Sequence, residues 1–354
     1  MRTNLFNTIL IILFAFSTLQ LWAQQKNTDS SAGIFDLLQS EELIEVDVKT
    51  DLSYLVTNKK TADEYIDGTF SFQTSKDVTL SLPVKVKCRG RYRRMKCEFP
   101  PLKLKFKKDD LAANNLNEFN ELKLVTHCIG DKKRSRDLIL RECLAYNLFN
   151  VLTPNSLRAQ LVKVNYLNVK GRPKKIKGWG ILIEDSDELA HRLKGEKYQR
   201  MGVPIDSFNL LQEQTAALFN YMIGNTDWSR VMARNIELIN SNDGIYIVPY
   251  DFDFAGMVNA PYAVPNSSIG QKSIKERHYL GEHFENAPAV QEVRQLFIHK
   301  KEAIFSTVDQ TKMLSSRSKN EVHKYLEDFY QLLESNEKLH TSISKHQGER
   351  MGTN

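Results

Sequence analysis

The sequence predicts an α+β fold with two unequal lobes, and three observations lead to that expectation. Strand patterns dominate the first half, a single long helical pattern interrupts them, and helical patterns dominate the second half. The 354 residues are 41% hydrophobic and 26% charged, which supports a sizeable core and excludes general disorder. We therefore expect a sheet-rich N-lobe over 41–185 and a mainly helical C-lobe over 186–342.

The strands of the first half are predicted from alternating apolar and polar residues and from β-branched runs between turn residues. Leu102-Lys103-Leu104-Lys105-Phe106 shows this alternation clearly. The predicted strands cover 43–48, 68–74, 79–88, 102–106, 122–126, 159–169 and 180–183.

One helix is predicted within this sheet-rich half, over 135–152. It has apolar residues near one helical face and stops at Thr153-Pro154, where proline cannot continue the hydrogen bonding. The residues of that face are Leu138, Leu140, Cys143, Leu144, Leu148 and Val151.

In the second half, a helix over 206–223 leads into a short hairpin, whose strands at 235–239 and 244–249 are separated by the turn Asn240-Ser241-Asn242-Asp243-Gly244. A long loop with two prolines follows, then helices over 289–304 and 318–333. We expect a polar tail over 343–354.

The N-terminus has the pattern of a signal peptide over 1–23. Arg2 precedes an apolar run at 9–21, and Ala23 supplies a small residue for cleavage. A membrane anchor is the alternative, but the run is shorter than the ~20 residues that a spanning helix needs. We therefore predict an exported protein, periplasmic or extracellular, with no membrane span after cleavage and a flexible leader over 24–40.

Four cysteines, Cys88, Cys97, Cys128 and Cys143, remain after that cleavage, in a compartment that permits disulfides. A bridge between Cys88 and Cys97 across the turn-like 89–96 is one interpretation. Four small buried hydrophobic residues are the other.

Basic residues cluster at 85–108 and 170–177, and the net charge of +6 falls to +5 on loss of Arg2. These clusters could meet phosphate, nucleic acid or an anionic surface, but solvated strand faces are the commoner explanation. Specific nucleic-acid binding is not predicted.

The most informative feature is the order of polar residues after the 206–223 helix. Asp227 comes first, Asn235 precedes the hairpin, and Asp251 and Asp253 follow it. Phosphoryl transfer needs these parts: one carboxylate to orient the attacking hydroxyl, and an Asn with a second carboxylate to hold Mg²⁺ against phosphates. We predict Asp227 as the base, and Asn235 and Asp251 as metal ligands.

These segments resemble the CotH-type (spore coat protein H-like) kinases of the atypical kinase-like superfamily. The resemblance rests on Ile223-Gly224-Asn225-Thr226-Asp227-Trp228-Ser229, on Arg234-Asn235, and on Pro249-Tyr250-Asp251-Phe252-Asp253, and it runs loosely over 84–258. It implies a two-lobed kinase-like fold that binds ATP or another nucleotide with Mg²⁺ or Mn²⁺. The acceptor would be a hydroxyl on a protein or a glycan. The run Gly180-Ile181-Leu182-Ile183-Glu184-Asp185 also fits, and the resemblance puts Glu184 beside the nucleotide base.

The chain departs from the kinase pattern in two places. Asp227 and Asn235 are further apart than in Asp-x-x-x-x-Asn, and Phe-Asp rather than Phe-Gly follows Asp251. Asp253 is therefore a second metal candidate, and Asn225 a less favoured substitute for the Asn. No G-x-G-x-x-G loop is present, although Arg89-Gly90-Arg91 could lie over phosphates.

An ATP site also needs a Lys for the phosphates and a helix Glu to orient it. The Lys candidates are Lys103, Lys105 and Lys123, and Glu142 is the expected partner. Each Lys is equally explained as part of a half-solvated strand.

Two alternatives stay open. Asp227 and Asp251 could simply cap a helix and end a strand, but carboxylates among Tyr250, Phe252 and Phe254 are costly unless a metal or donor satisfies them. The whole chain could also be a non-catalytic kinase-like module that binds a cell-surface polymer. The sequence shows neither a zinc-type His pattern nor a Gly-x-Ser-x-Gly elbow, and glycoside hydrolysis has no positive support.

Overall fold

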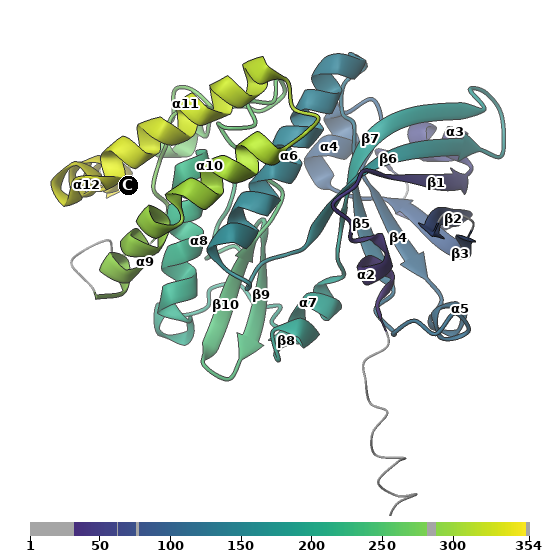
Figure 1. Ribbon diagram of the computed structural model, residues 1–354, viewed down its shortest axis with the longest axis horizontal. Coiled ribbons are helices and arrows are strands. Elements are labelled where there is room, and N and C mark those ends of the chain that lie inside the picture. The colour runs from purple at the N-terminus through teal and green to yellow at the C-terminus, as the bar shows by residue number, and fades with distance from the viewer. Residues whose placement is uncertain (1–31, 62, 76–77, 282–287, 352–354) are drawn as a thin grey trace, which may run out of the picture.

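The computed structural model describes residues 32–61, 63–75, 78–281 and 288–351. It confirms the α+β class: a sheet-rich part lies on one side of the molecule and a helical part on the other (Figure 1). The predicted signal peptide and residues 24–31 of the predicted leader lie outside the described residues. Within the described ranges, no helix has the length and apolarity needed to cross a bilayer.

Seven strands of the sheet-rich part close into a barrel in the order β1-β2-β3-β4-β5-β7-β6, and only the β1–β6 pair of this barrel is parallel. Each predicted strand is present. Because these strands form a closed barrel, the expected kinase-like two-lobed arrangement is not established. The strands are β1 (Ile44–Thr50), β2 (Ile66–Ser75), β3 (Val78–Cys88), β4 (Leu102–Phe106), β5 (Glu121–Thr126), β6 (Ala159–Asn168) and β7 (Lys175–Ile183).

In β4, the alternation of apolar and polar residues places apolar side chains inside the barrel and polar side chains on its outer face. Leu102, Leu104 and Phe106 of β4 are buried in the interior, whereas Lys103 and Lys105 point outward because successive side chains of a strand face opposite ways. In the register of the sheet, Lys103 lies opposite Lys123 of β5. The Lys candidates therefore share the outer face of β4 and β5.

Among the described residues, four short helices accompany the barrel strands, and two of them lie where a flexible leader and a turn were expected. Helix α2 (Ile34–Leu38) buries Phe35 and Leu38, so this part of the expected flexible leader is packed against the barrel core. Residues 91–96, expected as part of a turn, form α4 (Arg91–Lys96) after Gly90 in a left-handed conformation. The others are α3 (Leu52–Thr57) and α5 (Lys108–Ala112).

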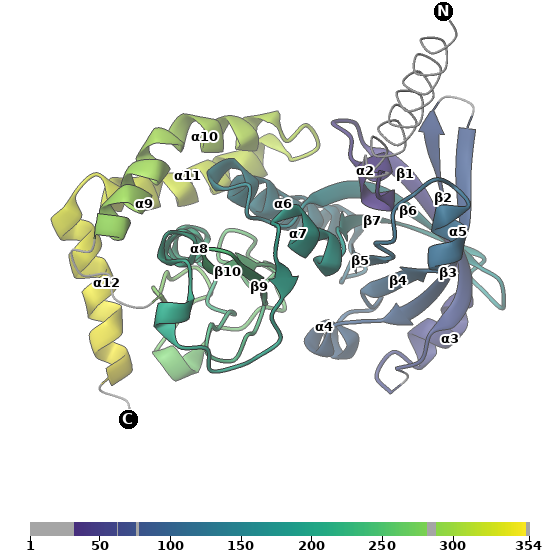
Figure 2. The same cartoon turned by 90° about the horizontal axis from the view of Figure 1, so that it is seen from below.

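Helix α6 (Lys132–Leu152) confirms the predicted helix within the sheet-rich half and lies between the barrel and the other helices (Figures 1 and 2). Its N-cap residue is Asp131, whose side chain accepts from the backbone N–H groups of the first turn. The buried side chains of α6 belong to the larger core, which also contains Val125, Ile181 and Ile183 from the barrel wall. The outer wall of the barrel therefore packs with the helical part in one core, whereas the barrel interior forms a second core of its own.

The helical part contains the predicted hairpin, which is present as β9 (Ile236–Ser241) and β10 (Gly244–Pro249). The helix expected over 289–304 is two helices that meet at Lys300, and residues 343–351 of the expected tail continue the last helix. The remaining elements are α7 (Ser186–Arg192), β8 (Glu196–Lys197), the 3₁₀ turns Ile205–Ser207 and Ser267–Ile269, α8 (Leu210–Ile223), α9 (Pro288–His299), α10 (Lys301–Gln310), α11 (Ser316–Leu333) and α12 (Asn336–Met351).

One disulfide joins Cys97 to Cys128, so neither interpretation of the cysteines was right. Cys88 and Cys143 are free and buried. Cys97 directly follows α4 and Cys128 lies between β5 and α6, so the bridge ties α4 to the segment that enters α6.

Candidate active site

The predicted base and the predicted Asn lie side by side. The Asn235 amide Nδ2 donates to the backbone oxygen of Asp227 at 2.6 Å and to its Oδ2 at 3.0 Å. The extra residues between them form a small closed loop, in which Ser229 and Arg234 exchange backbone hydrogen bonds of 3.0 and 2.9 Å. The unusual spacing is thus absorbed by a bulge that brings Asn235 back to Asp227.

Asp227 has a partly exposed carboxylate within a polar turn. Its backbone N–H donates to Asn225 Oδ1, so the Asn225 side chain fixes the turn. The Asp227 side chain is 35% exposed and its Oδ1 lies 3.4 Å from Arg234 Nε. Burial raises the pKa of Asp227, Arg234 opposes this shift, and Asp251 adds to it. Asp227 is therefore reachable from solvent and close enough to Asp251 for their charges to interact.

Asn235 and Asp251 are among six described non-glycine residues with a positive φ. Asn235 and Asp251 have φ of 53° and 64°, a left-handed conformation that Asn and Asp tolerate better than most side chains and that gathers at functional sites. The N–H of Tyr250 donates to the oxygen of Asn235, and the N–H of Asp251 donates to the Tyr146 hydroxyl on α6. The hairpin and α6 together fix the position of Asp251.

A group of charges, which we call the Asp251 cluster, consists of the buried Arg93, Glu142 and Asp253 and the half-buried Asp251. Arg93 of α4 is 6% exposed and lies 3.3 Å from a Glu142 oxygen and 3.6 Å from Asp253 Oδ2. It also donates to the backbone oxygen of Thr126. A single guanidinium thus serves a carboxylate from α6 and another from the segment after β10.

The carboxylates of the Asp251 cluster are electrostatically strained. Burial raises the pKa of Glu142 to about 7, against the attraction of Arg93 and with a further rise from Asp251. Burial also raises the pKa of Asp253 well above its usual range, and the negative charge of Asp251 adds to the effect. Like charges in a buried site disfavour ionisation of one another, so the cluster contains more carboxyl groups than Arg93 can hold ionised.

The three Lys candidates differ in their surroundings. Lys103 and Lys105 both pair with Glu121, at 2.6 and 3.3 Å. Lys123 reaches the helical part, where its Nζ lies 2.5 Å from a Glu237 oxygen and 4.9 Å from the centre of the Tyr250 ring. Lys123 therefore contacts the residue next to Asp251, and Glu142 pairs with Arg93 rather than with any of the three.

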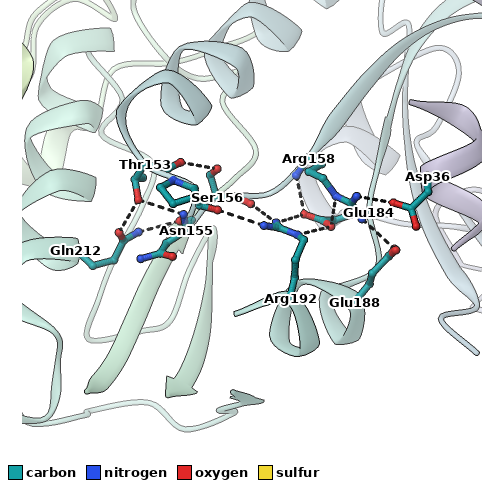
Figure 3. A network of polar contacts seen from close by, with 10 residues as sticks. Asp36, Thr153, Asn155, Ser156, Arg158, Glu184, Glu188, Arg192 and Gln212 are labelled. Atoms are coloured by element: carbon teal, nitrogen blue, oxygen red, sulfur yellow. Dashed lines mark hydrogen bonds and ion pairs between the residues drawn. The ribbon is translucent and has the colours of Figure 1, made fainter. Parts of the chain in front are cut away.

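Glu184 belongs to a second group of charges, the Glu184 network, at the link between the barrel and α7 (Figure 3). Its two oxygens lie 2.7 Å from Arg158 Nε and 2.7 Å from Arg192 Nη2, and its side chain is fully buried. Arg158 also pairs with Asp36 and Glu188. Both carboxylate oxygens of Glu184 are thus engaged by arginines that hold the link in place.

Sequence reasoning missed Arg93 and did not give Arg89 a site role beyond the suggestion that the Arg89-Gly90-Arg91 segment lies over phosphates. Arg89 is half-buried and its charge lowers the pKa of Glu142 and Tyr250, which places it beside the Asp251 cluster. Its side chain has no hydrogen bond or ion pair within the part of the chain that the structure describes. The only signal in the sequence was the basic composition of 89–96.

The donor set fits a hard divalent cation. No group of three or more His, Cys, Asp or Glu side chains among the described residues has metal-ligand geometry. Mg²⁺, however, is usually held by one or two carboxylates together with substrate phosphates. Asp253 Oδ2 is buried without a hydrogen-bond partner among those residues, and burial together with the charge of Asp251 raises the pKa of Asp253. Asp251 and Asp253 are therefore the residues that would hold such an ion.

Comparisons with known proteins give little. The sequence matches no protein-family model and no curated protein. Among solved structures, the chain is similar to the crystal structure of the Helicobacter pylori proinflammatory kinase CtkA, with 10% identity over 72% of this chain and 91% of that one. The TM-score is 0.38, which does not establish a common fold. The CotH-type resemblance therefore stays a prediction.

Proposed function

We propose that the protein is an exported phosphotransferase that moves a phosphoryl group from a nucleotide to a hydroxyl on a protein or a glycan. The observation that carries the proposal is that Asn235 hydrogen-bonds the Asp227 carboxylate, while the charge of Asp251 acts on both Asp227 and Asp253. The disulfide between Cys97 and Cys128 supports export, because such bonds persist mainly outside the reducing cytoplasm.

In this proposal Asp227 accepts the proton of the acceptor hydroxyl. The acceptor oxygen forms the new bond to phosphorus, the bond between phosphorus and the nucleotide's bridging oxygen breaks, and the shortened nucleotide leaves with that oxygen. The partial exposure of Asp227 suits this role, because an acceptor can reach it from solvent. Asn235 holds Asp227 through the 3.0 Å hydrogen bond to its carboxylate.

Asp251 and Asp253 would hold Mg²⁺ or Mn²⁺, which when bound neutralises phosphate charge. Cations beside the cluster could meet the remaining phosphate oxygens: Arg89, whose side chain has no ion pair within the described ranges, and Lys123. Arg93 is a positioning residue, because it contacts Glu142 and Asp253 and is itself buried.

Calorimetric titration of the chain from residue 24 with ATP, with and without Mg²⁺ or Mn²⁺, tests this proposal. We expect metal-dependent binding that Asp251→Ala abolishes and Asp227→Asn retains, because Asp227 is not assigned to the metal. Transfer of labelled γ-phosphate to the chain itself or to an added acceptor should be lost in both variants.

Asp206→Asn is the matched control, since Asp206 is an exposed carboxylate of the same half. It should leave binding unchanged. Failure of the unaltered chain to bind ATP under any metal condition would overturn the kinase mechanism. The chain would then fit the alternative of a non-catalytic module that binds a cell-surface polymer.

A further inference from the structure

A cavity of about 410 Å³ lies on the outer face of the barrel, at a place that the proposed phosphotransfer does not use. Its walls come from the first turns of α6, from the outer side of β6 and β7, and from the loop after β5. Its volume is in the range of small-molecule sites. It could therefore enclose one or two sugar rings or a group of similar size.

The cavity carries four cations, Lys132, Arg136, Lys163 and Lys177. None of these four forms an ion pair with any residue in the described ranges. Lys177 belongs to the basic cluster noted at 170–177. Unpaired cations that converge on one hollow create a positive potential that attracts an anion.

Two carboxylates also line the cavity, and each has one oxygen engaged. Glu45 accepts from Asn165 Nδ2 at 2.7 Å, and Glu98 accepts from the Gly130 backbone N–H at 3.1 Å. A carboxylate has room for further donors, so both can accept hydrogen bonds from hydroxyl groups. The cavity therefore offers acceptors for hydroxyls as well as cations for a negative group.

Buried polar atoms on the cavity wall lack partners among the described residues. Ser135 is 4% exposed and its Oγ has no hydrogen bond, and the same holds for Arg136 Nε and for His127 Nδ1. Burial lowers the pKa of His127, against the opposing charge of Glu98, and so favours the neutral ring. Buried polar groups are nearly always satisfied in folded proteins. Three unsatisfied atoms around one hollow indicate that something polar completes it.

Trp179 of β7 provides an aromatic wall. Its ring lies 6.0 Å from the Arg136 guanidinium carbon and 5.7 Å from Lys163 Nζ. A half-buried tryptophan is both a flat apolar surface and a partner for cations. The ring and the two cations therefore present apolar and positive surface together.

We propose that this cavity binds an anionic sugar residue, such as a uronic acid within a glycan. The carboxylate would meet Arg136, Lys163 and Lys177. The ring hydroxyls would satisfy Ser135, His127 and the two glutamates, and the apolar face of the sugar would lie on Trp179. The combination of aromatic surface, hydroxyl acceptors and unpaired cations favours a charged sugar over a simple phosphate. The inference does not depend on the proposed phosphotransfer.

Titration with trigalacturonate, monitored by calorimetry at low salt, tests the site. Neutral maltotriose and inorganic phosphate serve as comparison probes. We expect binding of trigalacturonate, at least about tenfold weaker binding of the two comparison probes, and weakening by added salt. Equal binding of maltotriose or of phosphate would overturn the assignment, as would no binding of trigalacturonate.

Variants locate the binding. Trp179→Ala and the double variant Lys163→Gln/Lys177→Gln should each weaken binding of trigalacturonate by roughly tenfold or more. Lys174→Gln/Lys175→Gln removes two charges from the same strand region outside the cavity and should leave binding unchanged. If both double variants lost trigalacturonate affinity equally, the effect would come from net charge alone, and the assignment of binding to this cavity would be overturned.

The thermal stability and the ATP affinity of each cavity variant are measured as controls. Arg136→Gln provides a second single variant inside the cavity in case Trp179→Ala fails to fold. Each variant should keep the thermal transition of the unaltered chain and its affinity for ATP with Mg²⁺. If ATP binding fails in every protein while trigalacturonate binds, the phosphotransfer proposal fails and this one stands.

Discussion

The Asp251 cluster and the Glu184 network are both buried groups of opposite charges, but they are built differently. In the Glu184 network, carboxylates and guanidiniums meet at 2.6 to 3.0 Å, and Glu184 has an arginine on each oxygen. In the Asp251 cluster the closest ion pairs are 3.3 and 3.6 Å long, and Arg93 Nε and Asp253 Oδ2 lack hydrogen bonds within the described ranges.

We interpret this difference as one between a structural use of charge and the functional use proposed above. A buried ion pair stabilises a fold only if geometry and hydrogen bonds offset the loss of hydration. Glu184 itself meets that condition at the link that enters α7, although Glu188 Oε2 of the same network also lacks a hydrogen bond among the described residues. In the Asp251 cluster, the donor Arg93 Nε and the acceptor Asp253 Oδ2 both lack hydrogen bonds among the described residues, and Asp253 Oδ2 is the acceptor that the proposed metal would satisfy. The longer ion pairs of the Asp251 cluster are therefore more informative about a functional site than the short ion pairs around Glu184.

Arg93→Met gives the largest expected effect on stability. It removes the guanidinium that lies between Glu142 and Asp253 and leaves two buried carboxylates without their cation. We expect a loss of about 3–5 kcal/mol in the free energy of unfolding, as for other broken buried pairs. Urea denaturation at pH 8 measures it.

Arg91→Met, on the exposed side of the same helix, is the control and should cost less than about 1 kcal/mol. A similar small cost for Arg93→Met would mean that the carboxylates of the cluster are already neutral. The contrast between the two networks would then be lost.

The pH dependence of stability sharpens the comparison. The folded-state pKa of Glu142 is about 7, above the usual 4.5. Its contribution is therefore fully present below pH 4.5 and is lost as the pH rises through 7. The expected loss is about 3 kcal/mol. Urea denaturation across pH 4.5–8 should show this fall in the unaltered chain and a smaller fall in Glu142→Gln.

Glu188 of the Glu184 network also has a pKa raised to about 7 by burial, so Glu188→Gln is measured alongside. It should remove a separate part of the fall. If Glu142→Gln leaves the pH dependence unchanged, Glu142 is not the strained acid that the cluster requires.

Glu184→Gln tests the other network and the role that the CotH-type resemblance implies for this residue. We expect a loss of about 2 kcal/mol in stability, because two charge-assisted pairs are weakened while Arg158 and Arg192 regain some water. ATP affinity should change by less than about twofold, since both oxygens are occupied by arginines. A large loss of ATP affinity at unchanged stability would instead place Glu184 at the nucleotide.

The smallest expected effect on stability is at the edge of the active site. Arg234 and Asp227 form a pair that is 51% and 35% exposed, so Arg234→Gln should change stability by less than about 1 kcal/mol. Removing Arg234 removes an attraction that lowers the pKa of Asp227. The acidic limb of the pH–activity profile should therefore move to higher pH. An unmoved limb would argue against Asp227 as the base.

Local pattern was enough to predict much of this protein. The alternation in 102–106 and the helical face in 135–152 reflect the spacing of side chains in a strand and a helix, which nearby residues set by themselves. The order of Asp227, Asn235 and Asp251 likewise predicted a shared site, because a hairpin returns the chain to where it started. The amino-acid sequence by itself was therefore sufficient to propose the base, the Asn and the acidic pair as one group.

Only the tertiary structure decided the rest. Closure of the barrel depends on the parallel pairing of β1 with β6, which are more than one hundred residues apart. Arg93 reaches Glu142 and Asp253 only because the folded chain brings α4 to α6, and the same approach joins Cys97 to Cys128. No local periodicity records such contacts, since burial and charge pairing between distant segments are settled by packing of the whole chain.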